Sequence, residues 1–259
     1  MIVRKQANGE LLLIGQTDHS RLVGQLAAHW GNDRFATPRP YDSVARAAAF
    51  HDYGWLRYET APVINDAGET PEFRQLPGNV NQLDAYQWCI DWMTSIDPYA
   101  GLMVGLHRTG LWRARYDTIS HPGMSIRKLG ADTEQFIAKN EARQKEEEKA
   151  FDPVELRTNY HLLQVWDLLG LYFCCQDTYD DYIEPVPLGY DGKKKNTVRL
   201  SLQALGPRKV AFEPFPFNSR SCEVQLAYRR LPATTYPDLD TFRRAYFQAR
   251  LEVMNFELV

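Results

Sequence analysis

The sequence predicts a mostly α-helical protein that carries one small antiparallel β-sheet. Through the middle of the chain, apolar residues recur at the i, i+3, i+4 spacing of a helix. Near the N-terminus an Asn-Gly turn, and later several alternating segments, predict strands. No Pro-, Gly- or Ser-rich linker divides the 259 residues. We therefore expect a single domain spanning 1–259, with a helical core over about 17–182 and a β subdomain from about 1–16 plus 183–259.

The N-terminal elements follow from turn and cap signals. Residues 2–16 predict a β-hairpin around Asn8-Gly9. The first helix has Asp18 as its expected N-cap and Gly31 as its end. Asp97-Pro98 is a good N-cap and first-position pair for a later helix. The expected helices span 18–31, 42–55, 83–93, 97–110, 132–151 and 159–175.

The C-terminal part changes its periodicity after Ile183. Segments separated by Gly and Pro alternate between apolar and polar residues, as strands do. We expect the N-terminal hairpin to join these strands in one small antiparallel sheet. The expected strands are 197–205, 209–217, 221–231 and 250–259, with a short helix over 237–249.

Composition excludes several classes of partner. The net charge is −3, so nothing favours a polyanion such as nucleic acid. The four cysteines form no CxxC pair, which indicates a reduced, cytoplasmic protein with buried thiols. The first residues are too interrupted for a signal peptide, and no window is long and apolar enough to span a bilayer. We expect neither nucleic acid nor a membrane as partner.

Histidines and carboxylates lie on the apolar faces of the expected helices. His19 and the adjacent pair His51-Asp52 are on such faces, and His107 is expected at a helix end, beside a loop. Asp167 is the only charged residue between Tyr160 and Cys175. A buried carboxylate needs a cation or strong donors, so a divalent metal and a distant arginine are its alternative partners. Each histidine taken alone also fits a core residue bonded to a carbonyl.

The order of these residues resembles the HD-domain superfamily of helical metal-dependent phosphohydrolases. The resemblance implies an HD-domain-like helical core and the metal ligands His19, His51, Asp52 and Asp167. The motifs GQTDHSRLVGQLA, AFHDYGW, DPYAGLMVGLHRTGLW, LLQVWDLLGLYFCC and FEPFPF together resemble an uncharacterised bacterial family, the domain of unknown function numbered 3891.

Imidazole and carboxylate ligands suit Mn, Fe, Co, Ni or Zn better than Mg or Ca. A metal-activated water would hydrolyse a small phosphoester, and a cation would hold the phosphate oxygens. Arg108 and Arg21 are candidates for that cation. The expected catalytic residues are Asp52, His107 and Arg108.

Two other functions remain open. His107 and His121 are candidates for a second metal, an order similar to the di-iron oxygenase branch and the two-metal phosphodiesterase branch of the same superfamily. The chain would otherwise be a non-catalytic protein that binds a metal for stability or sensing. The identity of the small-molecule substrate, the metal and the oligomeric state are not predicted.

Overall fold

A computed structural model describes residues 1–73, 80–113, 129–192 and 196–259. Helices make up about 49% of the described residues and strands about 21%. The helices are α1 (Gln16–His29), α2 (Tyr41–Phe50), α3 (Leu56–Glu59), α4 (Val80–Ile96), α5 (Pro98–Trp112), α6 (Ala131–Glu147), α7 (Pro153–Cys175) and α8 (Leu239–Gln248). The strands are β1 (Ile2–Lys5), β2 (Leu11–Ile14), β3 (Asp181–Pro187), β4 (Thr197–Gly206), β5 (Lys209–Glu213), β6 (Cys222–Leu231) and β7 (Leu251–Leu258).

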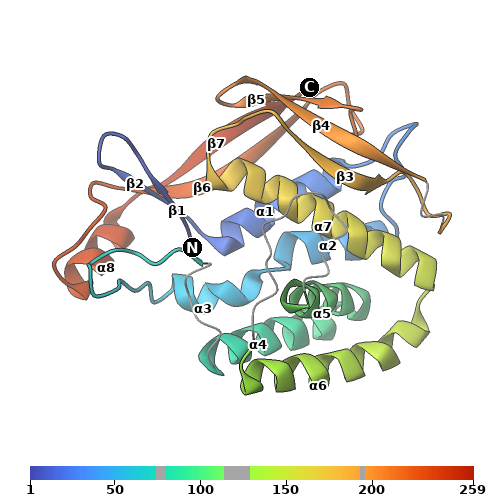
Figure 1. The fold of residues 1–259 in the computed structure, drawn as a ribbon, viewed down its shortest axis with the longest axis horizontal. Coiled ribbons are helices and arrows are strands. Elements are labelled where there is room, and N and C mark those ends of the chain that lie inside the picture. Colours follow the sequence, from blue (N-terminus) through green and yellow to red (C-terminus); the bar gives the residue numbers. More distant parts are fainter. Residues whose placement is uncertain (74–79, 114–128, 193–195) are drawn as a thin grey trace.

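All seven strands form one sheet in the order β1-β2-β6-β7-β5-β4-β3. The hairpin β1–β2 joins the later strands by pairing β2 with β6, with Leu11 opposite Leu231. The pair β5–β7 is parallel and the other pairs are antiparallel. The sheet curves over α1 and α7 like half a barrel (Figure 1).

The expectation of a mostly α protein with a small antiparallel sheet is therefore wrong. The fold is α+β, and its sheet is large and mixed. Strand β3 lacks the expected pattern because Pro185 and Pro187 interrupt it. The parallel pair consists of β5 and β7, which are separated along the chain by β6 and α8. Such pairing depends on tertiary packing, which alternation along one segment does not reveal.

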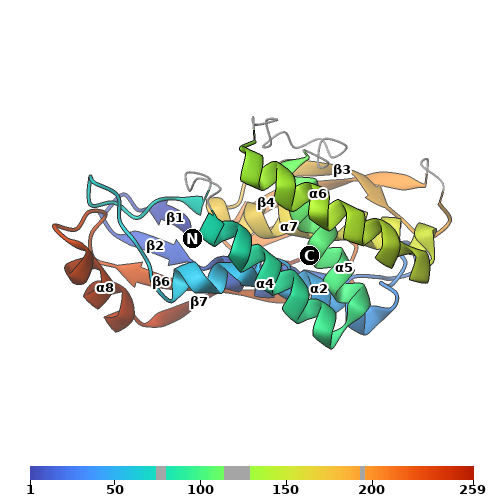
Figure 2. The same ribbon diagram turned by 90° about the horizontal axis from the view of Figure 1, so that it is seen from below.

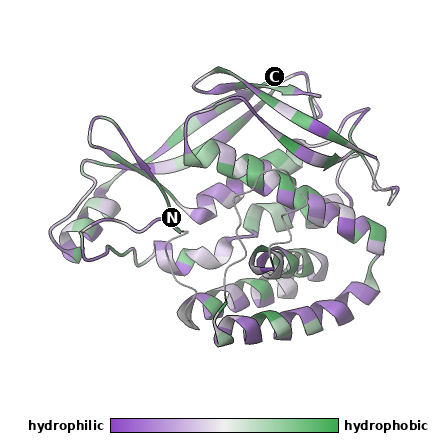
Figure 3. Cartoon of the chain, in the orientation of Figure 1, coloured by the Kyte–Doolittle hydropathy of each residue, from purple (hydrophilic) through white to green (hydrophobic). Residues whose placement is uncertain are grey.

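The helices cover one face of the sheet in layers. Helices α1 and α7 pack directly on it, α2 and α5 pack beneath them, and α4 and α6 lie farthest from the strands (Figures 1 and 2). Helix α6 is mostly hydrophilic along its length, as expected of a solvated outer helix (Figure 3). No helix in the described ranges combines the length and apolar character that crossing a bilayer requires.

Three helix boundaries differ from expectation near the candidate residues. Helix α1 begins at Gln16 after Gly15, so Asp18 lies in its first turn and is not its N-cap. Helix α2 ends at Phe50, and a short 3-10 turn over Tyr53–Trp55 replaces the predicted continuation to Trp55. Helix α5 continues through Gly110 to Trp112, so that His107 lies inside the helix rather than at its end.

Candidate metal centre

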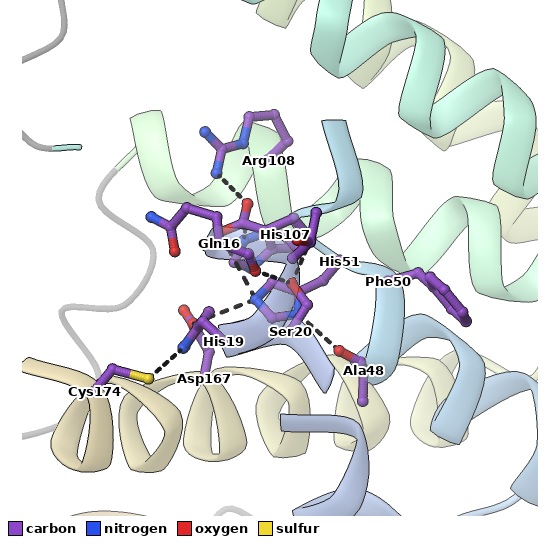
Figure 4. A network of polar contacts seen from close by, with 12 residues as sticks. Gln16, His19, Ser20, Ala48, Phe50, His51, His107, Arg108, Asp167 and Cys174 are labelled. Carbon is purple, nitrogen blue, oxygen red and sulfur yellow. Dashed lines mark hydrogen bonds and ion pairs between the residues drawn. The ribbon is translucent and has the colours of Figure 1, made fainter. Parts of the chain in front are cut away.

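Four helices bring polar side chains to one buried point. His19 comes from the first turn of α1, and His51 and Asp52 follow the last residue of α2. His107 comes from α5 and Asp167 from the middle of α7. All five side chains are buried (Figure 4 labels four of them). These residues, which the sequence singled out, lie up to 148 positions apart and meet in one cluster.

Asp167 lies between His19 and His51 and contacts both. Its Oδ1 lies 2.9 Å from His19 Nε2 and 3.4 Å from His51 Nε2. The rings of His19 and His51 meet edge to face, with their centroids 5.3 Å apart. His19, His51 and Asp167 offer ligand atoms that all lie within 4.8 Å of one another. This spacing allows the three side chains to bind a single ion.

Asp52 lies between His51 and His107. Its Oδ2 lies 3.9 Å from His51 Nε2, and its Oδ1 lies 3.7 Å from His107 Nε2. The rings of His51 and His107 are 4.7 Å apart at 81°. His51, Asp52 and His107 form a second group with ligand atoms within 4.8 Å. His51 belongs to both groups, so the five residues describe one continuous site.

The backbone of α2 fixes the tautomer of His51. His51 Nδ1 lies 2.8 Å from the carbonyl oxygen of Ala48, to which it donates its proton. The neutral ring then presents the lone pair of Nε2 to the oxygens of Asp52 and Asp167. A lone pair facing two carboxylates is repulsive unless a proton or a metal ion lies between them. Metal-binding histidines commonly make this backbone hydrogen bond through the other ring nitrogen.

Both carboxylates stay ionised inside the protein. Burial raises the pKa of Asp167, but its hydrogen bonds with His19 and His51 outweigh burial and hold the pKa well below its usual range. Burial likewise opposes ionisation of Asp52. The hydrogen bond with His107 and the charge of Arg108 nevertheless lower the pKa of Asp52. Two buried negative charges are therefore present where a divalent cation would bind.

The imidazoles differ in their affinity for a proton. Burial lowers the pKa of His51, but Asp167 and Asp52 outweigh it, so the pKa of His51 is raised. Burial dominates at His107 and lowers its pKa despite its hydrogen bond with Asp52. The raised pKa of His51 comes from the two carboxylates that face its Nε2. His107 stays neutral, the form in which imidazole binds metals.

Arg108 is the cation closest to Asp52. Its Nη2 donates a hydrogen bond to Asp52 Oδ1 over 3.1 Å. The guanidinium lies 3.8 Å from the centre of the Tyr86 ring and 5.3 Å from that of Trp112. These contacts hold Arg108 in place at the cluster. Trp112 thus packs against Arg108.

The donor atoms fit a transition metal. Ligand atoms about 2.1 Å from an ion lie roughly 3.0 Å apart in cis octahedral positions and roughly 3.4 Å apart in a tetrahedron. The distances from Asp167 Oδ1 to His19 and His51 match these values. Imidazole nitrogens mixed with carboxylate oxygens suit Mn, Fe, Co, Ni or Zn. The side chains present could therefore hold such an ion.

One candidate from the sequence does not join the cluster, and another cannot be placed. Arg21 is exposed and pairs with Asp18 on the same helix, so it does not contribute a cation there. His121 lies outside the described residues.

Sequence patterns missed three residues that touch the ligands. Cys174 Sγ lies 3.7 Å from His19 Nδ1. Ser20 Oγ accepts a hydrogen bond from the backbone N–H of Asp52 over 3.3 Å. A Cβ on Gly170 would lie 2.7 Å from His19 Cε1. Cys174 and Gly170 stand seven and three residues after Asp167 on α7, a helical spacing that could have indicated them.

Comparison with known proteins places the chain in one family. Neither the curated proteins nor the solved structures gave a match to the chain. A family described as "Protein of unknown function (DUF3891)" matches residues 1–233 and so covers every residue of the cluster. The chain belongs to the DUF3891 family.

Proposed function

We propose that the protein is a metal-dependent phosphohydrolase that acts on a small phosphoester. The observation that carries this proposal is the pair of buried His/Asp groups that share His51. A site of imidazoles and carboxylates inside the protein has the ligands that a catalytic transition metal requires. The order of these residues along the chain also resembles that of HD-type phosphohydrolases.

In this proposal His19, His51, Asp52 and Asp167 hold the metal. When bound, a divalent metal lowers the pKa of water toward about 7 and so supplies hydroxide at neutral pH. The hydrogen bond to Ala48 orients His51, and the hydrogen bond from Arg108 orients Asp52. His107 is neutral and buried beside Asp52, where it serves as a fifth ligand or exchanges a proton with substrate.

Arg108 has the chemistry to recognise the phosphate. A guanidinium has five N–H donors, so that it can bind a carboxylate and a phosphate oxygen together. The Tyr86 ring and Asp52 fix its position, which lowers the entropy lost on binding substrate. Arg108 would thus neutralise the charge that develops on the transferred phosphoryl group.

A di-iron oxygenase is the second candidate, because His107 forms its own group with His51 and Asp52. His51 offers one lone pair, since its other nitrogen donates to Ala48. His51 can therefore bind one ion only, and a second ion would need bridging carboxylates and further ligands. Metal stoichiometry and an iron absorption spectrum separate the two functions. One ion per chain favours the hydrolase.

Metal analysis followed by a phosphoester panel tests the proposal. Purified protein would be stripped with chelator, reloaded with Mn, Fe, Co, Ni or Zn, and assayed for phosphate release. We expect hydrolysis that requires metal and disappears in both H51A and D52N. A panel without hydrolysis, together with a melting temperature that chelator lowers, would instead indicate a non-catalytic metal-binding protein.

A further inference from the structure

Gln16 carries a buried polar atom that the cluster described above does not use. The residue is only 1% exposed. Its Oε1 has no hydrogen-bond partner among the residues that the structure describes. A buried carbonyl oxygen without a partner is destabilising, and native proteins pair most such atoms. A ligand with an N–H or O–H group would supply the partner that this oxygen lacks.

Helical geometry directs Gln16 toward the cluster. Gln16 is three residues before His19 and four before Ser20, so the three side chains share one face of α1. Ser20 Oγ donates to the backbone oxygen of Gln16 over 2.9 Å and accepts from the backbone N–H of Asp52. The first turn of α1 is thereby fixed against Asp52. Figure 4 shows the amide end of Gln16 at the side of this network, between Arg108 and Asp167 in that view.

We propose that Gln16 holds a water molecule against the His/Asp cluster, with its Oε1 as hydrogen-bond acceptor. This inference rests on the proposed function, in which water attacks the phosphoester. A carbonyl oxygen accepts hydrogen bonds and donates none, so it selects a ligand group with an N–H or O–H. Phosphate oxygens without protons do not satisfy it. Water does, and the hydrogen bond fixes where the lone pairs of the water point.

Stability of the metal-free protein gives the first test, with Q16M as the variant. Methionine has a similar length but no carbonyl, so the unsatisfied acceptor is removed. We expect the melting temperature of the chelated protein to rise by about 2–4 °C, because without the ion the water loses its other partner and the Gln16 carbonyl is left unsatisfied. The control is Q25M on the same helix, because Gln25 exchanges hydrogen bonds of 2.8 and 2.9 Å with the backbone of Gln225. Q25M should lower the melting temperature.

Water itself gives the second test. In water enriched in oxygen-17, the nuclear spin of a water oxygen bound to Mn²⁺ broadens the EPR lines of the metal. Q16M should show less broadening than wild type while its affinity for Mn²⁺ stays within about threefold. For any phosphoester that wild type hydrolyses, kcat should fall about 10- to 100-fold and KM should change little. Q25M should match wild type in all three measurements.

The outcomes separate this inference from the proposed function. A lower or unchanged melting temperature for chelated Q16M means that Gln16 has a structural partner, which overturns the inference. Unchanged EPR broadening overturns it as well. If wild type hydrolyses no phosphoester, the proposed function fails. The melting temperatures and the EPR lines still decide whether Gln16 holds water.

Discussion

His51 and Asp52 are neighbours in the sequence, and a helix break allows both side chains to face one point. Consecutive residues of a continuous helix point about 100° apart. Helix α2 ends at Phe50, and the backbone of Asp52 has φ −110° and ψ 18°, outside the helical range. The Nε2 of His51 and the Oδ2 of Asp52 consequently approach to 3.9 Å. The sequence pattern indicated the residues, but it placed them inside a helix.

Asp167→Asn tests whether a metal lies at the cluster. The substitution keeps the shape of the side chain and removes one anionic ligand. We expect metal affinity to fall at least 10- to 100-fold, since even loss of a supporting group has an effect of this size. Wild type should show a large loss of melting temperature on chelation, and the variant a small one.

The exposed carboxylate of Asp91 provides the matched control for that experiment. Asp91 pairs with Arg143 on the surface and its side chain is 55% exposed. Asp91→Asn should keep the full chelator effect on the melting temperature. If chelator has no effect on wild type, Asp167 does not bind metal, and its contacts with His19 and His51 are structural.

Gly170→Ala tests how tightly α7 holds His19. A Cβ at this position would lie 2.5 Å from Val23 Cγ2 and 2.7 Å from His19 Cε1, closer than atoms can approach. His19 must shift, so we expect a loss of about 1–3 kcal/mol in the free energy of unfolding. Metal affinity should fall with it. Gly189→Ala is the control, because its nearest new contact is 3.8 Å, and both quantities should stay unchanged.

At the scale of elements, α5 shows what its N-cap contributes to the site. Asp97 Oδ1 accepts from the backbone N–H groups of Tyr99 and Ala100 over 3.0 and 3.1 Å. Its other oxygen pairs with Arg46 of α2. The cap therefore orders the helix that carries His107 and joins it to the helix that precedes His51. The sequence predicted this cap because Asp-Pro is an unambiguous start signal.

Asp97→Asn should remove a pH-dependent part of the stability. Burial raises the pKa of Asp97, but its hydrogen bonds with Ser43 and Ala100 and the charge of Arg46 outweigh burial, so the pKa is lowered. A lowered pKa means that the carboxylate stabilises the fold above its unfolded pKa of about 3.9. That stabilisation is lost as the pH falls through the folded pKa.

Urea denaturation at several pH values checks this expectation. Because asparagine still caps a helix, the variant loses mainly the ion pair with Arg46, and we expect a loss of about 0.2–1 kcal/mol at neutral pH. Wild type and variant should then converge in free energy as the solution becomes acidic. A difference that stays constant over the whole range would show that the charge of Asp97 contributes nothing.

At the scale of the whole molecule, the sequence predicted local features better than tertiary ones. The hairpin, the cap at Asp97 and the cluster residues follow from short-range rules of turn, cap and apolar periodicity. The size of the sheet and its parallel pair β5–β7 depend on which strands become neighbours after folding. Gln16 escaped notice because a glutamine at the start of a helix has no distinctive pattern. Only its burial without a partner reveals it.

Two hydrophobic clusters divide the interior unequally. The larger one fills the space between the sheet and the helices that carry the candidate ligands. The smaller one lies at the end of the molecule where α8 packs beside the hairpin, and it includes Leu13, Leu231 and Phe242 (Figures 1 and 2). A metal ion bound by the His/Asp cluster would connect α1, α2, α5 and α7 but would not touch α8. Metal should therefore stabilise one part of the molecule more than the other.

Amide hydrogen exchange with and without metal measures that difference. A ligand present at 100 times its Kd stabilises the folded protein by about 2.7 kcal/mol. Amides of α1, α2, α5 and α7 that open together with the cluster should therefore exchange up to about 100-fold more slowly in the loaded protein. We expect the amides of α8 to open locally while the His/Asp cluster stays intact, so their exchange rates should not change. Equal slowing in α8 would show that the chain opens as one cooperative unit. No slowing in the four helices would mean that the side chains meeting at His51 do not bind the ion.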